Sequence, residues 1–225
     1  MIIVHDGDLV FHNEILALVE KSWSTSIQIH QTEPGKTLGE LRNLSMTLAS
    51  GEYICQWDDD DRYHPQRLEL QWLRLQEQQA EVCFLTDQLH YWEANHQLYW
   101  VNWNIEHYPY NLIPGTLMAK KDSLGQYPKM VRGEDSALVD NLLRHDVKIT
   151  RLERHGWLYI YCYTGQNTFT EDHHQAIIKL KKYPGAYLVS EYSVLEQRLN
   201  EYGPSILPVN MPWEDDTLTI NNLQE

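Results

Sequence analysis

Basic residues are scarce in this sequence. Its 225 residues include 18 lysines and arginines against 32 aspartates and glutamates, which gives a formal net charge of −14. A nucleic-acid partner requires a basic face that neutralises phosphates, so this balance argues against one. A small anionic ligand is still compatible with the composition, because a bound metal ion can offset its charge locally.

Cysteines are also few. The three present, Cys55, Cys83 and Cys162, lie inside apolar stretches and form no CxxC pair. This pattern predicts buried, reduced thiols rather than a disulfide framework or a zinc site. No stretch approaches the ~18 apolar residues of a membrane span, and no signal peptide opens the chain. We therefore expect a cytoplasmic protein without an integral membrane segment.

The apolar pattern predicts an α/β fold. Short runs typical of strands, at residues 2–5, 27–30 and 53–57, alternate with stretches of helical spacing at 11–22 and 38–49. Such alternation indicates a mixed, mostly parallel sheet flanked by helices. The second half is richer in aromatic residues and predicts further strands, at residues 82–91, 97–103 and 157–163.

Local signals set several boundaries. A helix should follow Pro65, with Leu68, Trp72 and Leu75 on its inner face. Another should begin near Thr168, which has capping-box spacing to Glu171. Prolines and scattered acids follow Tyr202, so we expect one domain over 1–202 and an extended tail over 203–225.

The sequence GEYICQWDDDDRYHP, residues 51–65, places four aspartates, 58–61, at the end of a predicted strand. Like charges ~4 Å apart repel by about 1 kcal/mol even in water, so the run needs a reason. In extended backbone Asp58 and Asp60 point to one side, and Asp59 and Asp61 to the other. One pair can then face Mg²⁺ or Mn²⁺, which take carboxylate and phosphate oxygens.

Two alternatives compete with a metal site at the aspartates. The run can be a solvated acidic turn. It can also be compared with an EF-hand, whose first, third and twelfth places match Asp58, Asp60 and Glu69. The EF-hand is rejected because Tyr63 stands where the loop requires glycine.

The stretch TLGELRNLSMTLASGEYICQWDDDDRYHPQRLELQ resembles the centre of a family 2 glycosyltransferase of the GT-A fold. In that family a G-x-x-RN helix precedes a GEYI strand, an aspartate cluster of the DXD type and a helix that begins with proline. Further on, GTLMAKKDSLGQYP is similar to the acceptor-side segment, RGEDSALVDNLL to the ED motif, and YTGQNTFTEDHH to the late histidine segment. The resemblance covers roughly residues 1–176.

The resemblance implies roles for individual residues. Asp58 or Asp59 would lie near the ribose or phosphate of a nucleotide-sugar, and Asp60 with Asp61 would hold Mn²⁺ or Mg²⁺ at the diphosphate. The nucleotide pocket would also be shaped by Arg42, Asn43 and, near the base, Asp6.

Glu134 and Asp135 match the ED motif, and the resemblance makes Asp135 the general base, which would take the proton of the acceptor hydroxyl. One in-line displacement would then invert the anomeric configuration. The bland alternative is that both acids only favour the start of a helix. His173 and His174 are candidate metal ligands. Because they lie about 100° apart on a helix, at most one should face the site, and both can simply face solvent.

We therefore expect metal-dependent transfer of a sugar from a nucleotide donor, expected to be UDP-linked, to an unknown acceptor. The alternatives are a non-catalytic relic or binding module of the same fold and a metal-dependent nucleotidyltransferase. The latter has no use for the GED helix and lacks a basic glycine-rich loop.

The resemblance also implies that the first strand–helix unit of the family is missing, since Met1 falls directly on the second strand. The strand at residues 2–4 should then have an unpaired edge, which proteins usually cover. We expect the C-terminal tail or a second subunit to cover it, or the chain to be a fragment. Nucleotide affinity should be weaker in either case.

Overall fold

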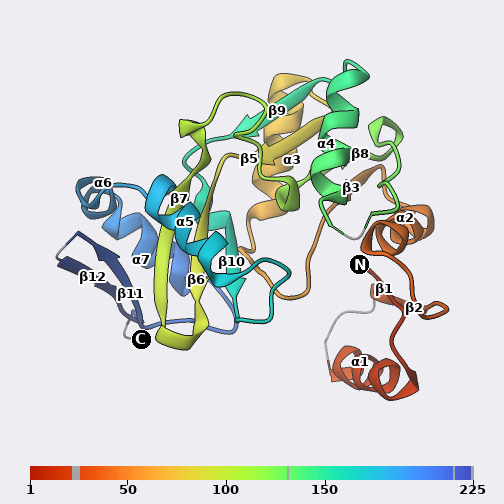
Figure 1. Ribbon diagram of the computed structural model, residues 1–225, viewed down its shortest axis with the longest axis horizontal. Coiled ribbons are helices and arrows are strands. Elements are labelled where there is room, and N and C mark those ends of the chain that lie inside the picture. Colours follow the sequence, from red (N-terminus) through yellow and green to blue (C-terminus); the bar gives the residue numbers. More distant parts are fainter. Residues whose placement is uncertain (22–25, 131, 215, 224–225) are drawn as a thin grey trace. The chain divides into compact units, whose positions relative to one another are not determined.

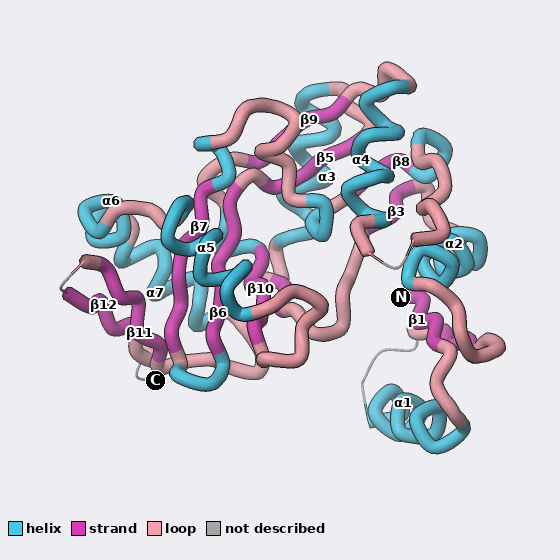
Figure 2. The backbone as a smooth tube through the Cα atoms, viewed as in Figure 1, coloured by secondary structure: helices cyan, strands magenta, loops and turns pink. Residues whose placement is uncertain are grey.

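The computed structural model describes residues 1–21, 26–130, 132–214 and 216–223 (Figure 1). The chain divides into two compact units. The first contains Met1–Ile54 and Ala119–Lys148, and the second contains Cys55–Met118 and Ile149–Glu225. Helices and strands alternate in both (Figure 2), so the mixed α/β class predicted from the pattern is confirmed. No described helix is both long enough and apolar enough to cross a membrane.

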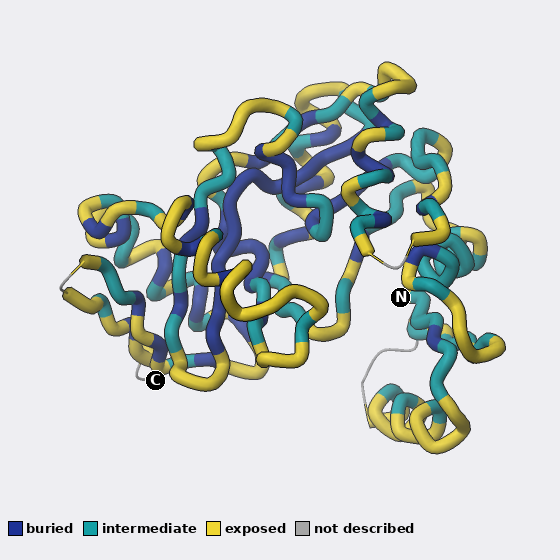
Figure 3. Tube along the Cα trace, in the orientation of Figure 1, coloured by how far each residue is buried: buried dark blue, intermediate teal, exposed yellow. Residues whose placement is uncertain are grey.

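The first unit begins with a strand–helix–strand segment. Strand β1 (Ile2–His5) pairs in parallel with β2 (Gln28–Gln31), and α1 (Leu9–Lys21) connects them. Among the described residues β1 pairs with β2 alone, and no residue of α1 is buried (Figure 3).

The other helices of the first unit are α2 (Leu38–Leu48) and α4 (Glu134–Arg144). A capping box starts α2, because the Thr37 hydroxyl accepts from the Glu40 amide while the Glu40 carboxylate accepts from the Thr37 amide. Strands β3 (Tyr53–Cys55) and β8 (Met118–Lys120) contain the points where the chain leaves and re-enters this unit.

The second unit carries a six-stranded sheet of order β12-β11-β7-β6-β10-β4. Its central pair is the antiparallel hairpin of β6 (Asp87–Trp92) and β7 (Gln97–Asn102), and β10 (Tyr159–Tyr163) runs parallel to β6. At one edge β4 (Arg62–Tyr63) is antiparallel to β10.

Strands β5 (Val82–Leu85) and β9 (Ile149–Leu152) pair in parallel. The described α-helices of this unit are α3 (Arg67–Gln78), α5 (Glu171–Lys181), α6 (Gly185–Ser190) and α7 (Tyr192–Asn200). Short 3-10 turns occupy Glu93–Asn95, Trp103–Ile105, Pro114–Thr116, Lys121–Ser123 and Gly156–Leu158, of which Lys121–Ser123 belongs to the first unit.

The single strand expected over residues 82–91 is two strands, β5 and β6, separated by Thr86. Both are fully buried (Figure 3), including the polar residues Asp87 and Gln88 at the start of β6, so burial does not change at the point where one strand ends and the next begins. The Thr86 amide donates to Leu152 of β9 at 3.1 Å, and after it the chain enters the six-stranded sheet.

The chain after Tyr202 is not an extended tail. It forms the hairpin of β11 (Val209–Trp213) and β12 (Asp216–Ile220), and β11 pairs with β7 (Figure 1). Alternate residues of β11, Val209 and Met211, are buried, which is the ordinary pattern of a strand that packs on one face. The prolines obscured this pattern in the sequence.

The inner face of α3 also differs from the expectation. Leu68 and Trp72 are exposed, at 45% and 44%, whereas Arg67, Gln71 and Leu75 are buried. Burial of Gln71 is possible because its amide donates to the carbonyls of Thr116 (2.8 Å) and Cys83 (3.3 Å). Polar groups with internal partners therefore take the places that hydrophobic spacing assigned to Leu68 and Trp72.

The late helix begins later than the sequence indicated. Helix α5 starts at Glu171 with Thr170 as its N-cap residue, so the capping box expected at Thr168 does not form. The cysteines follow the prediction in that all three are free thiols, although Cys55 is only partly buried.

A buried carboxylate, that of Asp87, joins three parts of the second unit. Asp87 is fully buried at the start of β6 and accepts from the indole of Trp100 (2.7 Å) and the amides of Gly156 (2.9 Å) and His155 (3.2 Å). A Cβ at Gly156 would meet Trp100 Nε1 at 2.3 Å, so only glycine allows this approach. Burial raises the pKa of Asp87 to about 6, although the three donors act in the opposite direction.

The raised pKa makes the stability of this unit pH-dependent. The usual aspartate value is ~3.9, so between about pH 4 and pH 6 the folded chain binds more protons at Asp87 than the unfolded chain does. The contribution of Asp87 to the free energy of unfolding must therefore fall as the pH rises from about 4 to about 6. We predict that wild type loses stability relative to Asp87→Asn over this range, measured by urea unfolding. Asp216→Asn, at an exposed aspartate of the same unit, should show the wild-type slope, and parallel curves for Asp87→Asn would contradict the prediction.

Candidate functional site

The four aspartates form a turn after β3 rather than a straight extension of it. The backbone turns at Asp59 and Asp60, which are exposed, while Asp58 and Asp61 are half-buried. The expected alternation of side chains therefore does not hold. Asp58 accepts from the Gln56 amide at 3.0 Å, and the turn distributes the charges between the surface and the interior.

Asp61 is the acid that faces inward. Its Oδ2 accepts from the Tyr159 hydroxyl at 2.5 Å and its Oδ1 from the Cys162 amide at 2.9 Å, both on β10. Burial raises the pKa of Asp61 to about 7, and the nearby carboxylates of Asp60 and Asp58 raise it further, against the two hydrogen bonds. Asp61 thus fastens the turn to the six-stranded sheet.

A layer of aromatic rings lies beside the turn. The Asp58 amide donates to the Tyr63 hydroxyl at 2.7 Å, and the Tyr63 ring is 4.0 Å from Trp57 and 5.4 Å from Tyr159 between centroids. The guanidinium of the fully buried Arg67 lies 4.5 Å from the Tyr63 centroid. Its two terminal nitrogens have no hydrogen-bond partner in the described part of the chain, so cation–π attraction is their main compensation.

Sequence reasoning missed this supporting layer. Tyr63 entered the prediction only as the residue that excludes an EF-hand, and Arg67 and Tyr159 were given no role. One signal was available in the sequence. Tyr63, in RY, and Arg67, in HPQR, closely follow the four aspartates, which places them next to the proposed site. The partner Tyr159, almost a hundred residues later, could be found only from the fold.

The two histidines have different surroundings. His173 is exposed and its ring is 4.6 Å from Phe169, whereas His174 is buried against His90 (5.2 Å) and Tyr163 (4.7 Å). Burial, followed by the charge of His173, lowers the pKa of His174 to about 4, so this imidazole is neutral at pH 7.

A metal ion would have to be held by few protein ligands. Among the described residues no group of three or more His, Cys, Asp or Glu side chains is arranged to hold a metal ion. The metal roles of Asp60, Asp61, His173 and His174 stay predictions. Mg²⁺ commonly binds through one or two carboxylates and takes its other oxygens from phosphate and water, which this arrangement permits.

The ED motif lies on the first unit, at the start of α4. Glu134 is buried and forms an ion pair with Arg42 of α2 at 2.5 Å, which joins the two helices. Asp135 is half-buried and its Oδ1 accepts from the Ser136 amide at 2.6 Å. The next residue of α2, Asn43, exchanges two hydrogen bonds with the backbone of Tyr127, each 2.8 Å long. Glu134, Arg42 and Asn43 therefore have scaffold contacts, and their predicted roles in a site remain predictions.

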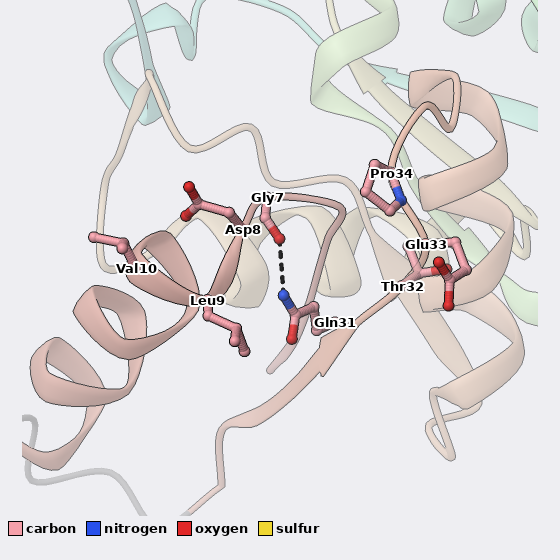
Figure 4. Close-up of a pocket in the computed structure, with 8 residues that line it drawn as sticks. All are labelled: Gly7, Asp8, Leu9, Val10, Gln31, Thr32, Glu33 and Pro34. Carbon is pink, nitrogen blue, oxygen red and sulfur yellow. Dashed lines mark hydrogen bonds between the residues drawn. The ribbon is translucent and has the colours of Figure 1, made fainter.

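A cavity of about 620 Å³ opens where the parallel strands β1 and β2 end (Figure 4). It is lined by residues 7–10, which lead from β1 into α1, and by residues 31–34 at the end of β2. The Gln31 side chain links the two segments by donating to the Gly7 carbonyl at 2.8 Å. Beside it, Asp6 Oδ2 accepts from the amides of Gly35 (2.9 Å) and Lys36 (3.1 Å). The loop 31–34 was not among the predicted site residues, although the rule that ligands bind at the carboxyl ends of parallel strands points to it.

The predicted site residues thus fall into two sets. Asp58, Asp59, Asp60, Asp61, His173 and His174 belong to the second unit, and Asp6, Arg42, Asn43, Glu134 and Asp135 belong to the first. Within the first unit, Arg42 contacts Glu134. In the second unit, Asn167, which follows β10, donates from its side-chain nitrogen to Asp60 Oδ2 at 3.5 Å.

The contact that fastens the aspartate turn can be tested directly. A hydrogen bond to a charged group contributes about 1.5–3 kcal/mol, so at pH 8, above the raised pKa of Asp61, Tyr159→Phe should lower the free energy of unfolding by about that amount. A double-mutant cycle with Asp61→Ala should give a coupling energy of similar size, measured by urea unfolding. Tyr161→Phe is the matched control, because the Tyr161 hydroxyl bonds only to Asn167, at 3.3 Å, among the described contacts. Equal losses for both phenylalanine variants, with no coupling, would contradict the assignment.

No protein-family model matches the chain, and no curated protein matches its sequence. Solved structures of S. aureus TarS do match. TarS 1–349 in complex with UDP is 13% identical over 89% of this chain and 69% of its own, with a TM-score of 0.55. The complex with UDP-GlcNAc is 12% identical over 91% of this chain and 58% of its own, with a TM-score of 0.56. The longer S. aureus TarS structure is 15% identical over 89% of this chain and 37% of its own, with a TM-score of 0.51. This chain therefore spans about a third to two thirds of these proteins. These likenesses show that the chain has a GT-A-like glycosyltransferase fold.

Proposed function

We propose that this chain is a family 2-type glycosyltransferase that moves a sugar from a UDP-sugar to an acceptor hydroxyl with inversion, assisted by a divalent cation. The observation that carries the proposal is the aspartate turn, 58–61, directly after a strand of a GT-A-like fold. The S. aureus TarS structures of this fold contain UDP and UDP-GlcNAc, which supports a uridine nucleotide as the donor group.

The proposed cation is Mn²⁺ or Mg²⁺, and the primary proposed ligand is Asp60. Its carboxylate is exposed at the turn, with half-buried Asp58 two residues away. Asp61 already accepts two hydrogen bonds, so we assign it mainly to holding the turn. Of the histidines, exposed His173 is retained as a ligand candidate, whereas His174 is buried among aromatic rings. When bound, such a cation stabilises negative charge on the departing diphosphate.

For the base and ribose of the nucleotide we propose a place within the first unit, the cavity at the ends of β1 and β2 (Figure 4). Its lining offers backbone groups and the carboxylates of Asp8 and Glu33, which suit the donors of a uracil ring and ribose. Asp6 uses Oδ2 to hold the loop at Gly35, and Oδ1 makes no hydrogen bond in the described part of the chain. We propose that Asp6 Oδ1 accepts from the base.

The proposed general base is Asp135. It takes the proton of the acceptor hydroxyl while that oxygen forms a bond to the anomeric carbon. The bond from that carbon to the diphosphate oxygen breaks, and UDP leaves with the electron pair. Because Glu134 is committed to Arg42, we assign it to positioning α4 rather than to proton transfer.

The second candidate function is a non-catalytic nucleotide or sugar-binding module, which the exposed helix α1 beside the cavity favours, because a base pocket with an uncovered wall binds weakly.

The cation proposal predicts that the chain binds UDP more tightly with Mn²⁺ or Mg²⁺ than with EDTA, measured by calorimetry. Asp60→Ala should abolish this difference, since it removes the proposed ligand. Asp59→Ala, at the neighbouring exposed position, is the control and should largely retain it. Equal UDP affinity in EDTA and Mn²⁺ for the unaltered chain would remove the metal from the proposal.

The base proposal predicts that Asp135→Asn keeps UDP binding but lowers sugar transfer by about 10²–10⁴-fold, because an amide cannot accept the proton. Transfer is measured with a panel of UDP-sugars and acceptors. Asp140→Asn, at an exposed aspartate of the same helix, should have near-normal activity. Glu134→Gln should instead lower the free energy of unfolding, since it leaves Arg42 without its partner carboxylate. Normal transfer by Asp135→Asn would reduce that acid to a helix-start residue.

A further inference from the structure

A second cavity, of about 410 Å³, lies in the second unit between the β6–β7 hairpin and helix α5. It is separate from the aspartate turn and contains none of the residues assigned above. Figure 1 shows α5 along this hairpin, and the elements are also joined by a bridge between Val101 and Lys182. Its volume is within the 300–1,000 Å³ range of small-molecule sites.

One face of each element lines this cavity. Gln175, Ile178 and Lys179 are three and four residues apart, so they share one side of α5. Gln97 and Tyr99 alternate along β7 and share one side of the hairpin. The lining is therefore a regular surface of two packed elements rather than a chance opening between loops.

The floor of the cavity is aromatic and well packed. Trp92 and Ile178 belong to one buried cluster with Val101, and Tyr99 packs against it. The Trp92 ring is 4.6 Å from Tyr163, which fixes it from the β10 side. These contacts hold the rings in place before any ligand binds.

Polar groups surround the aromatic floor. The Tyr99 hydroxyl donates to Gln97 Oε1 at 2.7 Å, and the Asn95 amide donates to the same oxygen at 3.1 Å. Gln175 and Lys179 are exposed on the facing side of α5, where the Gln175 amide donates to Glu171 Oε1 at 2.8 Å and leaves the Gln175 carbonyl oxygen as an acceptor. Rigid aromatic faces bordered by amides, a hydroxyl and an ammonium match a sugar ring, which presents C–H faces and hydroxyl edges.

We propose that this cavity binds a glycan and that the glycan is the acceptor, an inference that rests on the proposed function. The saccharide ring packs on Trp92 and Tyr99, and its hydroxyls bond to Gln175 and neighbouring polar groups. Two lysines, Lys179 and Lys182, and one acid, Glu171, line the cavity, and neither lysine makes an ion pair within the described residues. The net charge of the lining is therefore positive, so acidic sugars should be preferred to neutral ones.

The cavity is close to the aspartate turn through β10. Cys162, whose amide holds Asp61, pairs with Tyr91, and the next residue, Tyr163, pairs with Trp92. A glycan on the aromatic floor is therefore one strand away from the backbone that positions the turn. This neighbourhood suits an acceptor, which must present a hydroxyl to the transferred sugar.

The test measures saccharide binding to the full chain by calorimetry or by ligand-observed NMR. The probes are maltotetraose, cellotetraose, chitotetraose and trigalacturonate. We expect at least one to bind, and Tyr99→Ala and Gln175→Ala each to weaken it by about tenfold without changing UDP affinity. Gln197→Ala, at an exposed glutamine of α7, is the control and should bind as the unaltered chain does. Trp92→Phe keeps an aromatic ring in the buried floor and reports on stacking without emptying the core.

Each outcome decides between separate claims. Binding that Tyr99→Ala and Gln175→Ala weaken supports the cavity as a glycan site, and a preference for trigalacturonate that Lys179→Ala removes supports the role of the lysines. If no probe binds, or if both alanine variants bind normally, the inference is overturned. Glycan binding without turnover of any UDP-sugar would overturn the transferase proposal and the acceptor role, while the site itself stands.

Discussion

The buried carboxylate of Asp87 is the contact on which the second unit depends. It receives three hydrogen bonds, and it can do so only because Gly156 has no Cβ. Trp100 comes from β7, and Gly156 from the turn that leads into β10. The central hairpin and the strand beside it are thus aligned by a single group. An apolar side chain at Asp87 would leave the buried donors of Trp100 and Gly156 unpaired, and each would cost roughly 1–3 kcal/mol.

The position of β10 then determines where the turn of residues 58–61 is held. Tyr159 and Cys162 hold Asp61 from this strand, and the same strand places Tyr163 against Trp92. A shift of one residue in the pairing with β6 would move every side chain of β10 to the opposite face. Both the aspartates and the glycan cavity therefore depend on the register Cys162–Tyr91.

The sequence allowed the local elements to be predicted where one physical signal dominates. The helix expected over 38–49 and the strand expected over 2–5 are examples, because helical spacing and an isolated apolar run act locally. Long-range partners could not be predicted in the same way. Hydrophobic spacing placed Leu68 and Trp72 inside. Two polar residues are buried instead, because two distant backbone carbonyls accept from Gln71 and the Tyr63 ring receives Arg67.

The same limit applies to the candidate site. Residue types pointed to the aspartate run and the family resemblance to the ED pair, but neither showed which member of each pair has a structural partner. Glu134 is tied to Arg42, and Asp61 to Tyr159; these contacts involve residues 92 and 98 positions apart in the sequence. Only the fold reveals that division, since adjacent carboxylates are equivalent in composition and charge.

Asp60 with Asp61 and Glu134 with Asp135 are two pairs of adjacent acids. In each pair the arrangement holds one carboxylate in place although its neighbour repels it. Two neighbouring charges cannot both be buried cheaply, and two exposed ones would have no fixed position. Here one acid of each pair is anchored, Asp61 by a hydroxyl and an amide and Glu134 by a guanidinium. The anchored acid fixes the backbone, and the backbone fixes the direction of its neighbour. Asp60 and Asp135 are therefore placed by their partners in sequence, and the anchors of both pairs are as necessary to the proposed chemistry as the acids that would perform it.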